Sequence, residues 1–518
     1  MSYFSQWYSR FKLSPRPVHS AEIDDFFHKV QTSGIFADSK TFVDSVPRKP
    51  LYEIKRIYQS NPSYAQDLER FITEHFELPE HIAAPKRPEE YAPTLREYIG
   101  DTWKNLTRGP DAPKHGSSSL VLPRPYITPG GRFRELYYWD TYFIMVGLRE
   151  NGEITMIENM IENLAHLIRT YGLIPNSSHT YHLSRSQPPF FALMIQLLAN
   201  IRGERIYTDY LPDMLREYDY WMRGAQSISF RLHLSHASEH VMRMPDGSIL
   251  NRYYDDLAAP REESYREDLE LLANSPDPQR AYRSMRAAAE SGWDFSSRWC
   301  ATGDNLGTVR TLDVVPVDLN CVLYETENII ARACELANDT ERAAAFRSRA
   351  NARKQTILKY CWNDERGFFF DYVRGEKPAD KHLTLAGVFP LYVGIASPEQ
   401  AAKVTQVLSK DFLRTGGLLT TTTYTMQQWD APNGWAPLQY IATEGLERYG
   451  YSAHAEDIAR RWCAVVHYHF ERHKTIFEKY DVEHTAMIAG GGEYKVQEGF
   501  GWTNGVVLYF MNKYGIEF

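Results

Sequence analysis

The sequence of 518 residues lacks three features that would place it in a special class of protein. It has only five cysteines, odd in number and without C-x-x-C spacing, which argues against a disulfide framework and against a zinc–thiolate site. No stretch approaches the roughly 18 uninterrupted apolar residues that a membrane helix needs. No basic block occurs either, and the net charge of −8 argues against nucleic acid and anionic membranes as partners.

The first residues also lack an apolar run of signal-peptide length, so we expect a cytoplasmic protein. A periplasmic location is the alternative if a leader has been removed. A content of 43% hydrophobic and 24% charged residues is typical of a soluble globular protein. We expect a monomer that binds a small molecule, and neither nucleic acid nor a membrane.

What the sequence does contain is two runs in which tryptophan stands beside aspartate, Pro129–Tyr142 and Gln428–Pro437. Proline and glycine stiffen or turn both runs. Flat aromatic faces stack on the C–H groups of a sugar ring, and ionised groups bind its hydroxyls. A core helix or strand would not carry so many polar groups beside its tryptophans. The two runs therefore indicate a carbohydrate site.

Helical periodicity dominates from about Leu136 onward and predicts a mostly α-helical protein. Residues 1–115 read as an irregular or helical N-terminal extension that packs on the catalytic domain of residues 116–518. Strands are scarce, and Ser227–Leu234 is the best candidate. The segments with helical periodicity are Ile154–Ile168, Phe190–Ile201, Val322–Leu336, Glu399–Leu408, Trp435–Glu447 and Ala453–Val466. Helices of moderate length with rich loops between them suit a toroid whose loops line a central pocket.

Two carboxyl groups stand out as candidates for acid and base chemistry. Asp294 lies between two aromatic residues in Glu290–Trp299, where desolvation can raise its pKa as a general acid requires. Glu478 precedes a glycine-rich stretch, Gly490–Gly492, that can approach a ligand closely or close over it. Hydrolysis of a glycosidic bond usually needs two such groups. A structural role as a helix cap or an ion-pair partner is the alternative for each.

The segment His236–His240 matches the H-x-x-E-H pattern of some zinc proteases. On a helix, both histidines would lie on one face. No third ligand is identified, and such a match arises easily by chance in a long chain with 17 histidines. We therefore expect no metal site and no organic cofactor.

Taken together, the motifs resemble the trehalase family of inverting glycoside hydrolases. Both runs described above match the two signatures of that family. Four further stretches match in the same order, so the resemblance spans nearly the whole chain: Asp38–Asp44, Asn176–Pro189, Glu290–Trp299 and Phe477–Asn504. The resemblance implies an all-α, (α/α)6 toroid (a six-hairpin barrel) and hydrolysis of α,α-trehalose to two glucose molecules without metal or cofactor.

The resemblance also implies a role for individual residues. Asp294 takes the position of the general acid, and Glu478 takes that of the base which activates water. Room for that water puts the two carboxyl groups roughly 6.5–9.5 Å apart. The residues implied in substrate binding are Arg132, Phe133, Trp139, Asp140, Asn176, Arg185, Gln187, Arg261, Glu263, Gln428, Trp429 and Glu493. Three of these are arginines, whose positive field favours ionised Glu478 and opposes protonated Asp294.

Two departures from the family pattern affect loops. Glu262 stands where relatives usually have proline, and the glycine run Gly490–Gly492 is shorter than in some relatives. Two alternatives to a trehalase stay open. One is a related toroidal glucosidase that acts on another α-glucoside, and the other is a sugar-binding protein that has lost turnover.

Overall fold

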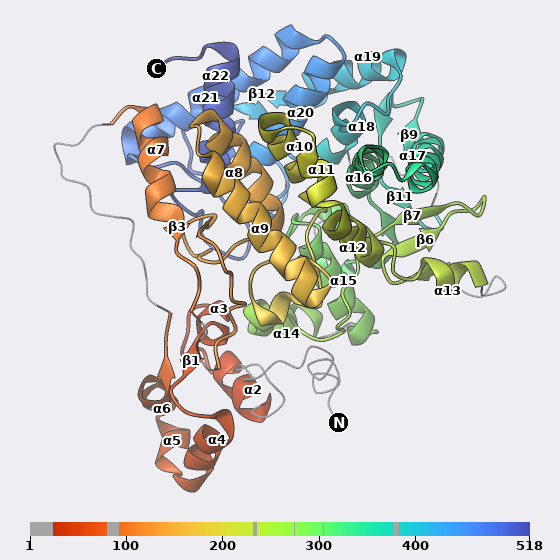
Figure 1. The fold of residues 1–518 in the computed structure, drawn as a ribbon. Coiled ribbons are helices and arrows are strands. Elements are labelled where there is room, and N and C mark those ends of the chain that lie inside the picture. Colours follow the sequence, from red (N-terminus) through yellow and green to blue (C-terminus); the bar gives the residue numbers. More distant parts are fainter. Residues whose placement is uncertain are drawn as a thin grey trace.

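Helices dominate the computed structural model (Figure 1). It describes residues 24–79, 93–112, 114, 116–230, 236–273, 275–303, 305–376 and 383–518. Each segment predicted to be helical from its periodicity lies in a helix, with the ends displaced by a few residues. Among the described helices, none is both long enough and apolar enough to cross a bilayer.

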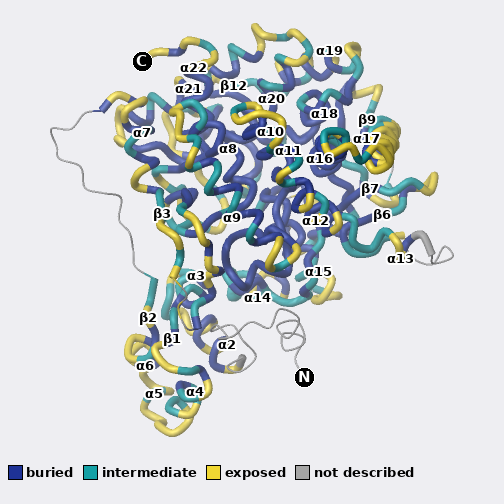
Figure 2. Tube along the Cα trace, in the orientation of Figure 1, coloured by how far each residue is buried: buried dark blue, intermediate teal, exposed yellow. Residues whose placement is uncertain are grey.

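Within the described residues, six helices form a closed inner ring in which each packs on the next (Figure 1). In ring order they are α8 (Tyr138–Glu150), α10 (Phe191–Arg202), α16 (Val317–Leu336), α18 (Phe389–Tyr392), α20 (Ala436–Arg448) and α22 (Gly501–Tyr514), and α22 packs back on α8. Nearly every residue of α8 and α22 is buried (Figure 2). Helices that are apolar on all sides belong in a protein core, which explains their inner position.

A second layer of helices covers the ring from outside. These helices are α7 (Leu95–Leu106), α9 (Ile154–Tyr171), α11 (Arg205–Asp209), α12 (Leu211–Trp221), α17 (Thr340–Tyr360), α19 (Pro398–Val407) and α21 (Ser452–His473). α7 packs on α22, α9 on α8, α12 and α17 on α16, and α21 on α20. One face of α9, α12 and α21 is buried and the other is polar, as expected of an outer layer. The predicted all-α toroid is therefore confirmed.

Further helices lie in the connections between ring members. They are α13 (Ala225–Phe230), α14 (Tyr265–Leu272) and α15 (Pro278–Glu290), the 3₁₀ turns η1 (Thr180–His182), η2 (Glu262–Ser264), η3 (Ser297–Trp299), η4 (Leu306–Thr308), η5 (Thr311–Asp313) and η6 (Leu385–Val388), and the π turn η7 (Leu408–Phe412). The strand predicted at Ser227–Leu234 is wrong over residues 227–230, which belong to α13, and residues 231–234 lie outside the described part. A short alternation of apolar and polar residues also fits a helical turn.

Strands are short and pair antiparallel in small ribbons. They are β1 (Val46–Pro47), β2 (Phe76–Glu77), β3 (Thr107–Arg108), β4 (Tyr126–Ile127), β5 (Ala237–Ser238), β6 (Val241–Arg243), β7 (Ile249–Asn251), β8 (Val314–Val315), β9 (Trp362–Asn363), β10 (Phe368–Phe369), β11 (Tyr372–Val373), β12 (Leu413–Arg414), β13 (Gly417–Leu418), β14 (Asn433–Trp435) and β15 (Lys479–Asp481). The pair β14–β15 sets Trp435 opposite Lys479. It thereby joins the second signature to the segment that follows Glu478.

The first part of the chain has a small hydrophobic cluster of its own, which includes Phe42, Phe71 and Phe76. Its helices are α2 (Asp24–Thr32), α3 (Lys40–Val43), α4 (Leu51–Ser60), α5 (Ser63–Gln66) and α6 (Leu68–His75), drawn in red at one end of the molecule in Figure 1. Apolar residues of α7, by contrast, belong to the main core. The predicted extension of residues 1–115 therefore contains helices that pack in this small cluster and a helix, α7, that packs in the main core. Its boundary at residue 115 stays a prediction.

The N-terminal ends of the inner helices meet at the central pocket. Trp139 lies in the first turn of α8, Trp435 directly precedes α20, and Phe500 directly precedes α22. All three side chains line the pocket. The loops that enter the ring helices thus carry the pocket residues, and the rigid ring fixes where those loops lie.

Candidate active site

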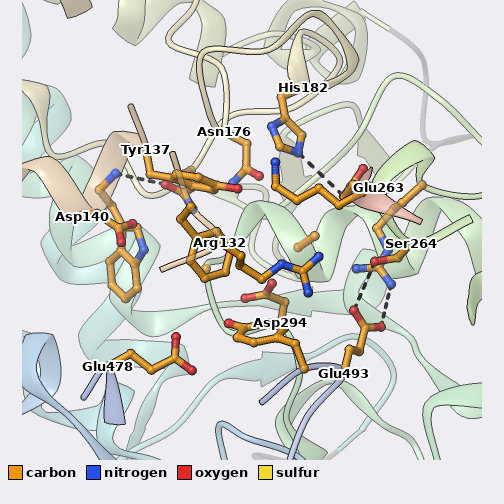
Figure 3. A pocket seen from close by; sticks show the side chains of 18 of the residues that line it. Arg132, Tyr137, Asp140, Asn176, His182, Glu263, Ser264, Asp294, Glu478 and Glu493 are labelled. Atoms are coloured by element: carbon orange, nitrogen blue, oxygen red, sulfur yellow. Dashed lines mark hydrogen bonds and ion pairs between the residues drawn. The ribbon is translucent and has the colours of Figure 1, made fainter. Parts of the chain in front are cut away.

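One central pocket collects the predicted site residues from loops that are far apart in the sequence (Figure 3). Both predicted catalytic residues line it, and so does every predicted binding residue except Gln428. The predicted residues in its lining are Arg132, Phe133, Trp139, Asp140, Asn176, Arg185, Gln187, Arg261, Glu263, Asp294, Trp429, Glu478 and Glu493. The roles of these residues stay predictions, but the structure brings them to one place.

Asp294 lies in a strongly desolvated part of the pocket, on the loop that follows α15. Burial raises the pKa of its carboxyl group to about 7, and the negative charge of Glu493 adds to this effect. Arg261 and Arg185 oppose it. Within the described residues, no other side chain donates a hydrogen bond to this carboxyl group. A carboxyl group in this environment keeps a proton close to neutral pH.

Glu478 is more deeply buried than Asp294, with 1% of its side chain exposed, and it has a cationic partner. Lys479 Nζ lies 3.1 Å from Glu478 Oε1 and is itself fully buried. Burial raises the pKa of Glu478, while Lys479 opposes that rise and favours the ionised form. The second carboxylate oxygen, Oε2, accepts no hydrogen bond from the described residues. It can therefore accept one from a bound molecule.

Gln428 lies behind the pocket rather than in its lining. Its Oε1 accepts a hydrogen bond of 2.6 Å from Lys479 Nζ, and its Nε2 donates to the backbone carbonyl of Asp294. One amide side chain therefore connects the partner of Glu478 to the backbone of Asp294. The structure thus places Gln428 between the two catalytic candidates, and its predicted role in substrate binding stays a prediction.

Asp140 is the third buried carboxyl group of the pocket. Burial raises its pKa well above the ordinary value, and the negative charges of Asp294 and Glu478 raise it further. In Figure 3 its side chain lies on the same side of the pocket as Glu478. Two or three carboxyl groups in one desolvated space cannot all ionise freely, so they share protons.

The arginines of the pocket are paired with carboxylates, which cancels much of their positive field. Arg185 lies 2.6 Å from Glu263, and Arg261 lies 2.7 Å from Asp268 and 2.9 Å from Glu493. Burial alone would raise the pKa of Glu263, but the nearby cations outweigh burial and hold that pKa well below the ordinary range. The arginines therefore do not prevent Asp294 from keeping its proton.

Arg132 is held from two sides at the edge of the pocket. Its guanidinium lies 3.9 Å from Asp38 and stacks 5.1 Å from the ring centre of Tyr494. Its backbone N–H donates to Gln497 Oε1 at 2.8 Å. The C-terminal loop that supplies Tyr494 and Gln497 contains Gly491 and Gly492, whose positive φ angles favour glycine.

The tryptophans form a stacked column rather than open platforms. Trp435 lies parallel to Trp429 at a centroid distance of 4.0 Å, and Trp293 lies nearly parallel to Trp429 at 5.4 Å. Trp429 is only 1% exposed. Its faces are thus covered by other rings, and only its edge can face a ligand. Phe133 is half-buried and makes edge-to-face contacts with Tyr137 and Tyr494, so it is the more accessible ring.

Several pocket residues were missed from the sequence. They are Asp38, Lys40, Tyr137, His182, Ser264, Glu267, Ala289, Gly292, Tyr494, Phe500 and Trp502. Asp38 and Lys40 lie in Asp38–Asp44, a stretch that matches the family and belongs to the predicted N-terminal extension. Lys40 is buried between Asp44 at 2.6 Å and Glu135 at 2.8 Å. Two carboxylates around one buried lysine hold its side chain in a fixed position, and the sequence alone does not show that these three residues meet.

The H-x-x-E-H segment does not form the helix that a zinc site of this kind requires. Residues 237–238 are strand β5, and Glu239 has a positive φ in the turn to β6. His240 is fully buried, and its Nε2 lies 3.1 Å from Glu290 Oε1. No group of three metal-ligating side chains is found among the described residues.

Glu262, which departs from the family pattern, is buried and paired with Arg286 at 3.0 Å. Burial raises its pKa, and Arg286 opposes that rise. The neighbours Arg261 and Glu263 still line the pocket. The departure therefore adds a buried ion pair and leaves both neighbours in place.

Comparison with known proteins agrees with this geometry. The family model described as Trehalase matches residues 34–515. The chain belongs to the trehalase family. It is accordingly a glycoside hydrolase by family, as predicted from the motifs. A periplasmic trehalase of Escherichia coli O6:H1 is 44% identical over 507 residues, which cover 96% of this chain and 88% of the relative. The same identity and coverages hold for a periplasmic trehalase of Shigella flexneri serotype 5b.

Solved structures are similar as well. The neutral trehalase Nth1 from Saccharomyces cerevisiae superposes with a TM-score of 0.62 at 27% identity, over 82% of this chain and 80% of the yeast chain. A mannosylglycerate hydrolase of Thermus thermophilus has a TM-score of 0.53 at 18% identity over 80% of this chain and the whole of its own, which shows a shared fold. The bacterial relatives are named periplasmic, which is at odds with the predicted cytoplasmic location and agrees with the alternative.

Proposed function

We propose that this chain hydrolyses α,α-trehalose to two glucose molecules, with Asp294 as general acid and Glu478 as general base. One observation carries the proposal. Two desolvated carboxyl groups, Asp294 and Glu478, line the same pocket, and of these two only Glu478 has a cation within ion-pair distance, Lys479. Membership of the trehalase family supports trehalose as the substrate.

The mechanism follows from the surroundings of the two groups. Asp294 donates its proton to the bridging oxygen as the bond from that oxygen to C1 breaks. Glu478, through its unpaired Oε2, accepts a proton from a water that attacks C1 on the opposite face. The proton on Asp294 moves to the leaving glucose, and the proton of water moves to Glu478. The attacked glucose is released in the β form and the leaving glucose in the α form.

The charge of the lining favours a neutral sugar over a phosphorylated one. Seven carboxyl groups line the pocket, namely Asp38, Asp140, Glu263, Glu267, Asp294, Glu478 and Glu493, against the four cations Lys40, Arg132, Arg185 and Arg261. Arg185 and Arg261 are already paired with carboxylates. Even with Asp140 and Asp294 protonated, five carboxylates remain against four cations, so a phosphate group would meet more negative charge than positive charge. We expect trehalose 6-phosphate to be a poor substrate.

A substrate panel tests the proposal. Glucose release is measured from trehalose, maltose, kojibiose and trehalose 6-phosphate, with and without a metal chelator. The expected result is that trehalose has by far the highest kcat/KM and that the chelator changes nothing. A higher kcat/KM for another disaccharide would make the chain a different α-glucosidase. Binding of trehalose without glucose release would make it a sugar-binding protein.

We also propose a periplasmic location, which the names of the bacterial relatives support. Fractionation of the source cells, with marker enzymes for each compartment, tests it, and recovery in the cytoplasmic fraction would contradict it. The predicted monomer is tested by light scattering, where a mass near 60 kDa is expected.

A further inference from the structure

The helix that leads into the loop of Asp294 carries two charged side chains that do not line the pocket. These are Arg286 and Glu290, one helical turn apart near the C-terminal end of α15. Both are completely buried. Residues four apart on a helix lie on the same face, so both point into the same neighbourhood. Buried charges are costly unless they are fully bonded, and these two are.

Arg286 makes four hydrogen bonds with its guanidinium group. Nε donates to Asp255 at 2.9 Å, Nη2 donates to Ser184 Oγ at 3.1 Å, and Nη1 donates both to the carbonyl of Pro260 and to Glu262, each at 3.0 Å. A planar fork of donors holds several acceptors at defined angles, which a lysine cannot do. Arg286 therefore fixes two separate loops against one helix.

The groups that Arg286 holds lie directly beside pocket residues. Ser184 precedes Arg185, and Glu262 stands between Arg261 and Glu263. Asp255, which accepts from Arg286, also lies 3.4 Å from Arg185. One side chain behind the pocket thus supports both arginine-bearing walls.

Glu290 supports the same two loops one turn further along the helix. It accepts hydrogen bonds from the backbone N–H of Ser186 at 2.9 Å and of Tyr254 at 2.7 Å. It also accepts from the hydroxyl of Tyr220 at 3.0 Å and lies 3.1 Å from His240 Nε2. His240, the last residue of the H-x-x-E-H segment, is therefore a hydrogen-bond partner of the Glu290 carboxylate.

We propose that Arg286 and Glu290 are positioning residues that hold Arg185 in a fixed place relative to the acid Asp294. Arg286 bonds to the residue before Arg185, and Glu290 bonds to the residue after it. The same helix ends four residues before Asp294. A rigid helix that clamps one pocket wall and leads into the acid loop sets the spacing between them. The proposal rests on the proposed function, since it assumes that Asp294 protonates the leaving group.

The first test replaces Arg286 by lysine, which keeps the positive charge but lacks the planar set of N–H donors of the guanidinium group. We expect kcat/KM to fall by about 100-fold, because small misplacements of reacting groups cost that much. The decisive readout is a double-mutant cycle with Arg185→Lys. If Arg286 acts through Arg185, Arg286→Lys costs at least tenfold less in the Arg185→Lys background than in the parent. Equal losses in both backgrounds would overturn the proposal.

Arg280→Lys is the matched control for this cycle. Arg280 lies on the same helix and makes an exposed ion pair with Asp313. Its replacement is expected to leave kcat and KM within twofold of the parent. A loss at Arg280 equal to that at Arg286 would show that any disturbance of α15 has the same effect, against the proposal.

The second test replaces Glu290 by glutamine and stands even if Arg286→Lys does not fold. Activity is measured on trehalose and on α-D-glucosyl fluoride, whose leaving group needs little protonation. If Glu290 positions the acid, the loss on trehalose exceeds the loss on the fluoride by tenfold or more. Equal losses on both substrates would refute a role through Asp294. Glu270→Gln, at an exposed position of α14, is the control and is expected to behave as the parent.

The parent enzyme separates this inference from the proposed function. If the parent hydrolyses another α-glucoside instead of trehalose, the trehalose assignment fails, and the same variants are compared on that substrate. The positioning roles of Arg286 and Glu290 are then decided by the double-mutant cycle and by the losses of Glu290→Gln on the two substrates.

Discussion

Asp294 and Glu478 line one pocket and are both desolvated, yet their immediate neighbours differ. Asp294 receives no hydrogen bond from another described side chain, and its pKa is raised to about 7. Glu478 has the ammonium group of Lys479 at 3.1 Å. The difference shows that burial alone does not assign acid and base. The assignment rests on one cation, Lys479, which forms an ion pair with Glu478. Among the described residues, no cation forms such a pair with Asp294.

The largest expected effect comes from removing either carboxyl group. Asp294→Asn and Glu478→Gln are each expected to lower kcat on trehalose by about 1000-fold, which is the usual contribution of a general acid or base. The measurement is glucose release at saturating trehalose, with folding checked by circular dichroism. Glu498→Gln, an exposed change on the C-terminal loop, serves as control. Turnover within tenfold of the parent in either variant would contradict the assignment.

The next effect tests the cation itself. In Lys479→Met, the pKa of Glu478 rises because the charge that favours its ionised form is gone. The acidic limb of the pH profile of kcat/KM is expected to move to higher pH by about one unit or more. The loss of a buried ion-pair partner is also expected to lower the Tm. Lys495→Met, at an exposed position, is expected to leave the profile unchanged. An unshifted acidic limb in Lys479→Met would show that Lys479 does not tune the base.

A smaller effect is expected at the acid end. Glu493 raises the pKa of Asp294 through its negative charge, so Glu493→Gln lowers that pKa. The acid then loses its proton at lower pH, and the basic limb of the pH profile moves down by up to about one unit. KM is fitted separately, because Glu493 is also a predicted binding residue. A basic limb that moves upward would have the wrong sign for this account.

The smallest expected effect is on stability. The raised pKa of Asp294 means that its proton favours the folded state, so stability is fully present below the ordinary pKa of 3.8 and is lost as the pH rises through about 7. Asp294→Asn cannot ionise and escapes this loss. Its Tm is expected to exceed that of the parent by a few degrees at pH 8 and to differ little at pH 4. The same Tm difference at both pH values would contradict a buried acid of this kind.

The sequence predicted the fold from periodicity and the site from motifs, with different success. Helices such as α9 and α21 were found because one face is apolar, whereas the ring itself appears only when distant helices such as α8 and α22 are seen to pack together. The carboxyl groups Asp294 and Glu478 were found through their motifs. Lys479 was not singled out, although it directly follows Glu478.

The contacts that make the site work could not be predicted from the sequence. Asp38 reaches the pocket from the N-terminal part, Gln428 joins two loops from behind, and Arg286 supports two walls at once. Each of these contacts joins loops that are far apart in the sequence. Local sequence patterns do not show which loops the toroid brings together. The stacking of Trp429 between other rings is a further example, since the sequence does not show which rings cover its faces.

The central claim is that Asp294 and Glu478 act on opposite faces of one sugar in a single displacement by water. Proton NMR of the products in the first minutes, before mutarotation mixes the anomers, tests this most directly. The account predicts one β-glucose and one α-glucose from each trehalose. Release of α-glucose alone would contradict it.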